Sequence, residues 1–181
     1  SESAPTAIPV PASVVCDFAM HSQHGTRHGE MNQDGVFCRR VASSAGEVVV
    51  GAVFDGHGLL GELASAAAVA RLELLLSTPS AVDALVDDTP AWVVWAFGCL
   101  QESVAEAHND PPAQYRYPGK PGSEPLVFER EDVGGRFGVL YNCTSASMPA
   151  AQIDFGCTAA MAVVVGDVLT TGCIGDAGAV L

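Results

Sequence analysis

Short runs of apolar, β-branched residues lie near both ends of the chain and predict strands. A small, polar segment at residues 42–46 joins two of these runs, and Gly46 can supply the positive φ that a hairpin turn needs. Gly166-Asp167 is an equally clear hairpin signal between the last two runs. The predicted strands are residues 14–20, 35–38, 47–54, 158–165 and 168–174, with a further strand from Ala177 to Leu181.

Two helical segments lie between the groups of strands. Residues 61–76 are rich in Ala and Leu, and residues 89–107 begin with Thr89 as the expected cap and Pro90 in the first turn. In the first of these helices Leu63, Ala67, Ala70 and Leu74 are apolar residues at helical spacing. The order of elements predicts an α+β fold in which helices pack on a mainly antiparallel sheet.

One folded domain is expected at residues 13–181, after a flexible N-terminal lead-in at residues 1–12. The stretch at 109–150 is the least regular, with five prolines between Pro111 and Pro125, and it is interpreted as a Pro/Gly-rich insertion.

Composition excludes some classes of partner. The chain has 8 basic and 21 acidic residues, a formal net charge of −13, which disfavours nucleic acid and anionic membrane surfaces. No apolar stretch approaches the roughly 20 residues that a bilayer crossing requires. The six cysteines include no C-x-x-C pair, and residues 1–11 do not resemble a secretory leader. These features favour an intracellular, cytoplasmic or nuclear, location.

Two carboxylates stand where the backbone must turn. Asp34 directly precedes a predicted strand, and Asp55 closes the next one. If these strands pair as a hairpin, the start of one lies beside the end of the other, so the two side chains approach each other. Close carboxylates repel, and a divalent cation such as Mg²⁺ or Mn²⁺ relieves the repulsion. The pattern therefore predicts a metal site.

Asp55 opens the tetrapeptide Asp55-Gly56-His57-Gly58. Gly56 allows the backbone to come close enough for its carbonyl oxygen to act as a ligand, and His57 can donate a proton near neutral pH. Taken alone, the same tetrapeptide would serve equally well as a simple turn after a strand.

Four motifs in order resemble the protein phosphatase 2C family of metal-dependent serine/threonine phosphatases, most closely its plant and algal members. They are Asn32-Gln33-Asp34, Val53-Phe54-Asp55-Gly56-His57-Gly58, Gly156-Cys157-Thr158-Ala159 and Gly175-Asp176. The resemblance covers about residues 14–76 and 155–181.

The resemblance implies an antiparallel β-sandwich flanked by helices, with two Mg²⁺ or Mn²⁺ ions at one end. It implies hydrolysis of phosphoserine and phosphothreonine in proteins by a metal-bridging hydroxide, without a phosphoenzyme. Site roles carry over to this chain by position. They are metal binding for Asp34, Asp55, Gly56 and Asp176, protonation of the leaving group for His57, an indirect contact through metal-bound water for Gln33, and phosphate binding for Arg27.

The chain also departs from the family pattern. The family's G-D-S-R appears as Gly175-Asp176-Ala177-Gly178, and the family's later D-G-x-x-D and D-N motifs are not found before Leu181. About the first half of the sandwich is therefore expected here, and a missing half or a partner would cover its open face. Two alternatives stay open: a pseudophosphatase that serves as a binding or structural module, and a generic α+β domain whose D-G-H-G is only a turn.

Overall fold

The computed structural model of the protein describes residues 3–9, 19–23, 32–44, 46–112, 114–115, 122, 125–132, 139–142 and 151–179. Within these residues the fold is α+β, as the sequence predicted, with antiparallel strand pairing throughout. The elements are β1 (Ser3–Pro9), β2 (Gly35–Ser43), β3 (Gly46–Gly58), α1 (Gly61–Leu75), α2 (Pro79–Asp87), α3 (Thr89–Asn109), β4 (Gln114–Tyr115), β5 (Leu126–Glu131), β6 (Val139–Asn142), β7 (Ala151–Ile153), β8 (Phe155–Val165) and β9 (Val168–Ile174).

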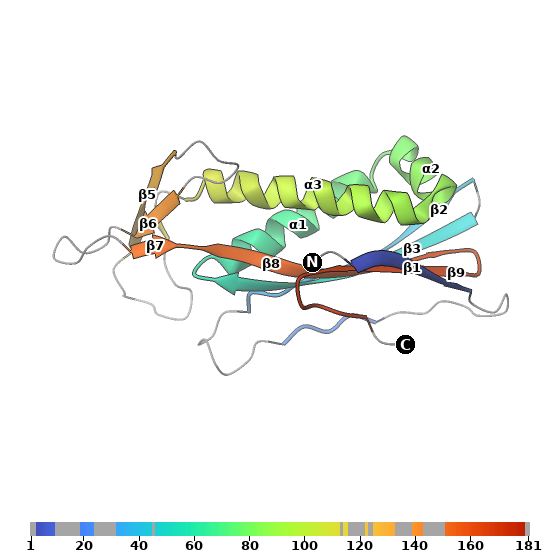
Figure 1. The fold of residues 1–181 in the computed structure, drawn as a ribbon, viewed down its shortest axis with the longest axis horizontal. Coiled ribbons are helices and arrows are strands. Elements are labelled where there is room, and N and C mark those ends of the chain that lie inside the picture. The colour runs from blue at the N-terminus through green and yellow to red at the C-terminus, as the bar shows by residue number, and fades with distance from the viewer. Residues whose placement is uncertain are drawn as a thin grey trace.

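The larger sheet has five strands in the order β1-β9-β8-β3-β2, and its long central strands are β3 and β8 (Figure 1). β2 starts opposite Phe54 of β3, and β9 ends opposite Ala159 of β8. β3 and β8 stay paired beyond these points, as far as Gly58 and Phe155. The inner strands therefore continue past their neighbours as a two-stranded ribbon, and this step in the sheet positions the candidate site.

Helices α1 and α3 cover one face of the sheet, and α2 lies beside the start of α3, near the end that carries the β2–β3 turn (Figure 1). Side chains along β3 alternate between the two faces of the sheet, as expected for a sheet covered by helices on one face. Val50, Ala52 and Phe54 are buried in the core, whereas Val53 is half exposed on the other face. Each large apolar side chain buried here stabilises the fold by roughly 2 kcal/mol.

Both predicted hairpin turns are confirmed. Gly46 has φ 106° and closes the β2–β3 hairpin at its pair with Ser43. Gly166 has φ 59° in the turn between Val165 and Val168. Most L-residues avoid a positive φ, so glycine fixes where these two strands reverse.

Two elements, one at the edge of the five-stranded sheet and one in the helical layer, were not predicted from the sequence. Ser3–Pro9, expected to be part of a flexible lead-in, forms β1 at the edge of the sheet and pairs with β9. An edge strand tolerates proline because one side of its backbone needs no partner in the sheet. Helix α2, with Pro79 in its first turn and Val82 and Leu85 buried, was not predicted at all.

The cap of α3 differs from prediction, and the structure shows which face of α1 is buried. The cap of α3 is Asp88 rather than Thr89, because the Asp88 carboxylate accepts a hydrogen bond from the Ala91 backbone N–H at 3.0 Å. Helix α1 buries Ala64, Ala68, Leu72 and Leu75 and leaves Leu74 55% exposed. The small side chains of Ala64 and Ala68 let the helix lie close to the sheet.

The Pro/Gly-rich stretch contains regular structure within its described part. β4, β5 and β6, with β7 after it, form a second, four-stranded sheet in the order β4-β5-β6-β7. It lies at the end of the molecule where α3 finishes (Figure 1). The predicted strand at 177–181 is wrong over 177–179, which have no regular structure.

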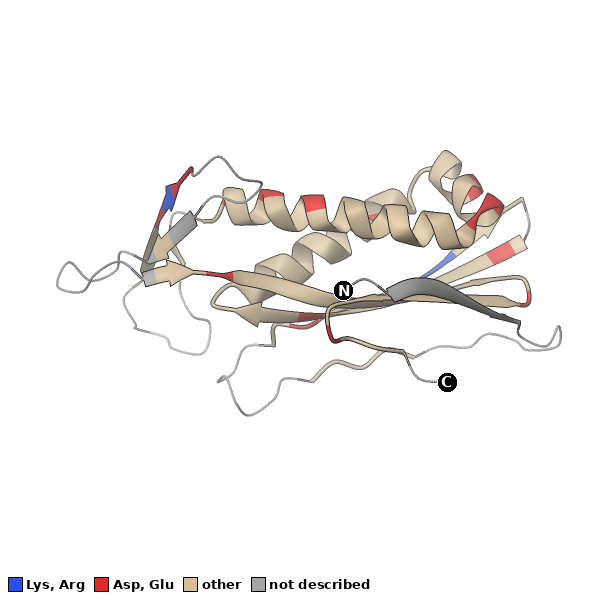
Figure 2. Cartoon of the chain, viewed as in Figure 1, with Lys and Arg blue, Asp and Glu red and all other residues tan. Residues whose placement is uncertain are grey.

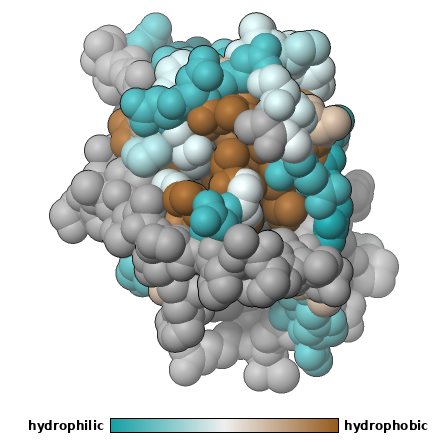
Figure 3. Space-filling view, turned by 90° about the vertical axis from the view of Figure 1, so that its right-hand side faces the viewer, coloured by the Kyte–Doolittle hydropathy of each residue, from teal (hydrophilic) through white to brown (hydrophobic). Residues whose placement is uncertain are grey.

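The face of the five-stranded sheet opposite the helices is apolar, with Val36, Val53 and Ala162 lining a groove of about 310 Å³ beside residues 19–21 and 178–179. At the end of the molecule where α2 lies, apolar surface shows between hydrophilic side chains (Figure 3).

None of the helices in the described part of the chain combines the length and apolar character needed to cross a membrane.

Candidate metal centre

The sheet brings all four sequence motifs to the same place. Asp34 precedes the first residue of β2, whose partner is Phe54, so it lies beside Asp55. Asp55 pairs with Thr158 of β8, and Gly175 follows the end of β9 next to Thr158. One row across the sheet therefore contains Asp34, Asp55, Thr158 and Gly175. At this row β2 and β9 end, and the β3–β8 ribbon continues beyond it.

Asp34 and Asp55 are brought together, as the hairpin argument predicted. Opposed residues on antiparallel strands have Cα atoms about 4.5–5.5 Å apart. Both carboxylates are exposed, and the pKa of Asp34 is raised, first by partial burial and second by the charge on Asp55. A cation placed between them would remove this repulsion.

Gly56 lies where three segments of backbone converge. A Cβ atom built on Gly56 would lie 2.3 Å from the Gln33 carbonyl oxygen and 2.6 Å from that of Gly61. No side chain fits in this space without a shift of the main chain. The glycine therefore lets the segment before β2 and the start of α1 pack directly on the end of β3.

Gln33 ties these segments together. Its amide Nε2 donates to the Gly58 carbonyl oxygen at 2.8 Å and to Glu62 Oε2 at 3.2 Å. Ser65 Oγ of α1 donates to the Gln33 carbonyl oxygen at 2.7 Å. These bonds hold Gln33 next to the Asp34–Asp55 pair and fix the start of β2 against α1.

His57 is exposed on the ribbon beside Gly156. The His57 ring atom Nε2 lies 3.1 Å from the position that a Cβ atom on Gly156 would take. Because residue 156 is glycine, the imidazole can lie over the neighbouring strand, two residues from Asp55. This position lets His57 act as a proton donor near the carboxylate pair.

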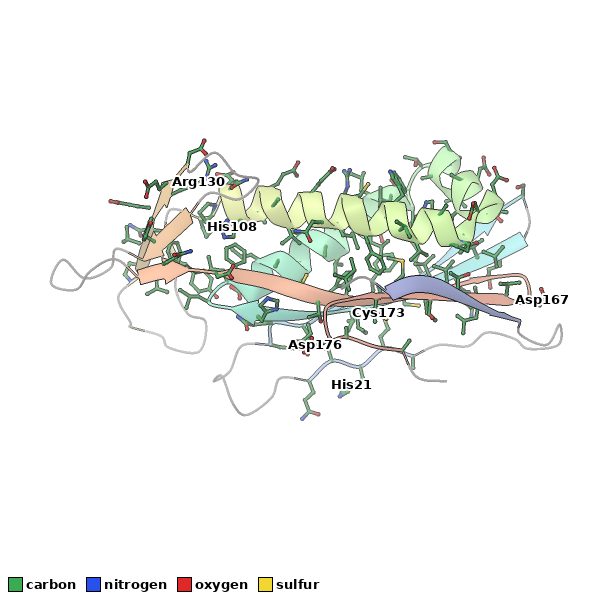
Figure 4. The ribbon with its side chains drawn as sticks, viewed as in Figure 1. His21, His108, Arg130, Asp167, Cys173 and Asp176 are labelled. Atoms are coloured by element: carbon green, nitrogen blue, oxygen red, sulfur yellow. The ribbon has the colours of Figure 1, made fainter. Side chains whose placement is uncertain are left out.

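Asp176 is exposed in the turn after β9, on the side of the sheet away from the helices (Figure 4). Neighbouring strands are about 4.8 Å apart, so two strand spacings separate β9 from β3 by roughly 10 Å. Asp176 therefore lies at the same end of the sheet as Asp55 but outside the Asp34–Asp55 pair. Arg27, predicted to bind phosphate, lies outside the described residues.

Thr158 and Glu62 also lie at the site, although their positions in the sequence predict no role for them. Thr158 pairs with Asp55, and its Oγ1 is buried without a hydrogen-bond partner among the described residues. Glu62 Oε1 is likewise buried without a hydrogen-bond partner among the described residues. Its other carboxylate oxygen, Oε2, accepts a hydrogen bond from Gln33 Nε2. Thr158 belongs to the third motif, but Glu62 carries no sequence signal because an acidic residue in the first turn of a helix is commonplace.

Cys157 lies next to the candidate site, opposite Gly56 on the ribbon. Burial, together with the nearby charge of Asp55, raises the pKa of its thiol to about 11. The thiol therefore stays protonated at neutral pH, whereas a cysteine nucleophile must be a thiolate. Cys157 is therefore poorly suited to act as a nucleophile.

The donor set fits a hard divalent cation. Two carboxylates, a nearby backbone carbonyl and an unpaired hydroxyl are oxygen donors of the kind that Mg²⁺ and Mn²⁺ prefer. Within the described residues, no group of three or more His, Cys, Asp or Glu side chains could hold a metal ion. Asp34 and Asp55 alone would thus leave most of an ion's coordination to water and other oxygens, which Mg²⁺ tolerates.

A cavity of about 410 Å³ lies on the helix side of the ribbon and shares His57 with the candidate site; its lining also includes His108, Asp154 and Phe155. The His108 ring stacks on Phe155, with ring centroids 4.8 Å apart. Burial lowers the pKa of His108, an effect that Asp154 opposes and Arg130 reinforces. Figure 4 shows His108 at the end of α3, near Arg130 and away from Asp176.

Comparisons of the chain with protein-family models, with curated proteins and with solved structures give no match. What the site can do must therefore be inferred from its own residues.

Proposed function

We propose that this chain carries the metal-binding half of a metal-dependent serine/threonine protein phosphatase with a sandwich similar to that of the protein phosphatase 2C family. One observation carries the proposal: four motifs, far apart in the sequence, meet in one row across the sheet. A set of unrelated turns would have no reason to converge on a pair of opposed carboxylates.

The residues of the chain have distinct roles in this proposal. Asp34, Asp55 and the Gly56 carbonyl would supply oxygen ligands for two Mg²⁺ or Mn²⁺ ions. Bound divalent ions would lower the pKa of water and offset charge on the phosphoryl oxygens. Gln33 holds its segment in place through its bonds to Gly58 and Glu62.

His57 acts on the leaving group. Its exposed imidazole, two residues beyond Asp55, donates a proton to the serine or threonine oxygen as the phosphorus–oxygen bond breaks. The substrate is a phosphoprotein. Asp176 follows β9, which is separated from β2 by β8 and β3, so its contribution would be to an additional, outer ion.

A pseudophosphatase is the second candidate. It is favoured by the two-carboxylate site, because the described residues hold no third acidic, His or Cys side chain close enough to complete a ligand group. Replacement of the family's Ser and Arg by Ala177 and Gly178 points the same way. Such a protein would keep the fold as a binding module and turn over no substrate.

The test is hydrolysis of p-nitrophenyl phosphate and of a phosphothreonine peptide by the full-length product of the gene that encodes this chain. We expect turnover with added Mn²⁺ and none with EDTA. A folded, Mn²⁺-loaded protein that hydrolyses neither substrate would refute the phosphatase and favour the binding module.

A further inference from the structure

The helical layer contains an apolar groove, well apart from the row of motifs at the sheet end. It has a volume of about 590 Å³ and lies between the end of α1, the outer side of α2 and the start of α3. Its lining residues are Leu74, Leu75, Thr78, Ser80, Ala81, Ala84, Asp88, Ala91, Trp92 and Trp95.

Small side chains create the groove. α2 buries Val82 and Leu85 on its inner side, and presents Ser80, Ala81 and Ala84 to the groove. This spacing places the three small residues along one stripe of the helix. The α2 wall therefore leaves room that a larger side chain would fill.

The groove is lined by large apolar groups that solvent reaches. Leu74 is 55% exposed and Trp95 49% exposed, whereas Trp92 is buried. The two indole rings lie 6.1 Å apart at 59°, and Trp92 Nε1 has no hydrogen-bond partner among the described residues. An exposed Trp such as Trp95 beside a hollow is typical of a binding surface.

The negative charge around the groove favours a basic ligand. Residues 61–109 carry seven carboxylates and one basic residue, Arg71. Asp88 lines the groove, and Asp83 and Asp87 are exposed on α2 beside its small-residue stripe. Figure 2 shows this concentration of acidic positions on α2 and α3. Acidic surroundings repel a second copy of this chain, with its net charge of −13, and an anionic membrane.

We propose that this groove binds a basic amphipathic helix of a partner protein, with apolar side chains against Trp95 and Leu74 and Lys or Arg side chains toward Asp83, Asp87 and Asp88. The apolar stripe of such a helix fills a groove of this shape, and its flanking cations meet the acidic edge. The site is independent of the metal centre, so it would hold for an active phosphatase and for a binding module.

Tryptophan fluorescence gives a direct measurement, because the only two tryptophans of the chain, Trp92 and Trp95, both line the groove. The probe is an 18-residue helical peptide of Leu and Lys with the leucines on one face. Its controls are the same peptide with Glu in place of Lys and a scrambled Leu/Lys peptide. We expect a saturable spectral change with the amphipathic Lys peptide, at least about tenfold tighter than with either control.

Variants distinguish binding in this groove from general electrostatic attraction of a basic peptide to an acidic protein. Leu74→Asp should weaken binding about tenfold, and Ala84→Phe, which adds no further tryptophan, should block it by filling the hollow. Val94→Asp is the matched control, since Val94 is 54% exposed on α3 but does not line the groove. Asp87→Asn should weaken binding more than Glu106→Gln, and the difference should shrink in high salt. Equal binding of all three peptides, or equal losses for Leu74→Asp and Val94→Asp, would overturn the proposal.

Discussion

Replacing Asp55 with Asn should reduce metal-dependent phosphatase activity at least a hundredfold, an order of magnitude typical of losing a central electrostatic group. Asp55 occupies the middle of the row, opposed to Asp34 on one side and to Thr158 on the other. Asn keeps the shape of the side chain but removes the charge that a cation needs. The measurement is Mn²⁺-dependent hydrolysis of p-nitrophenyl phosphate by the full-length protein.

The same substitution should not destabilise the metal-free protein. The charge on Asp55 helps to raise the pKa of Asp34, and a carboxyl group whose pKa is raised by folding costs stability once the pH exceeds that pKa. Removing the charge lowers that cost, so in EDTA at neutral pH the variant should melt at the same or a higher temperature. Asp167→Asn, in the turn at the other end of the sheet (Figure 4), is the matched control and should change neither property. Full activity in Asp55→Asn would remove Asp55 from the site.

Replacing Gly56 with Ala should lower the free energy of unfolding by about 3 kcal/mol or prevent folding. The new Cβ would lie 2.3 Å from the Gln33 carbonyl oxygen and 2.6 Å from that of Gly61, and both are backbone atoms that cannot rotate away. The segment before β2 would have to move away from β3, taking Asp34 with it. Chemical denaturation measures the loss.

Gly51→Ala is the control on the same strand. Its nearest neighbour would be Cys38 Sγ at 3.9 Å, an ordinary contact distance, so the change in stability should stay below about 1 kcal/mol. If Gly56→Ala proves as mild as Gly51→Ala, the three segments are not packed as tightly as the structure shows.

The hairpins at the centre of the sheet could be predicted from the sequence because the determining signals are local. Gly46 and Gly166 mark the turns by their positive φ, and β-branched runs flank each of them. The closeness of Asp34 and Asp55 then follows from the antiparallel register alone.

Other elements could not be predicted because tertiary packing decides them. Ser3–Pro9 becomes a strand only because β9 offers it an edge, more than 150 residues away in the sequence. Helix α1 is apolar on several sides, so spacing could not tell the buried Leu72 from the exposed Leu74. The short α2 has too few residues for its period to be clear.

The site was predictable in part for the same reason. Its carboxylates belong to recognisable motifs, whereas Glu62 enters through the packing of α1 against Gln33. The hydroxyl of Thr158 matters only because the register places it opposite Asp55. Contacts between strands and helices that are distant in sequence leave no local signal.

The most direct test of the metal centre is Mn²⁺ binding to the 181-residue chain, measured by calorimetry or by electron paramagnetic resonance of free Mn²⁺. We predict saturable binding to the unaltered chain and to Asp167→Asn, and loss of that binding in the double variant Asp34→Asn/Asp55→Asn. Unchanged binding in a folded double variant, or no binding by the unaltered chain, would contradict a metal centre at this end of the sheet.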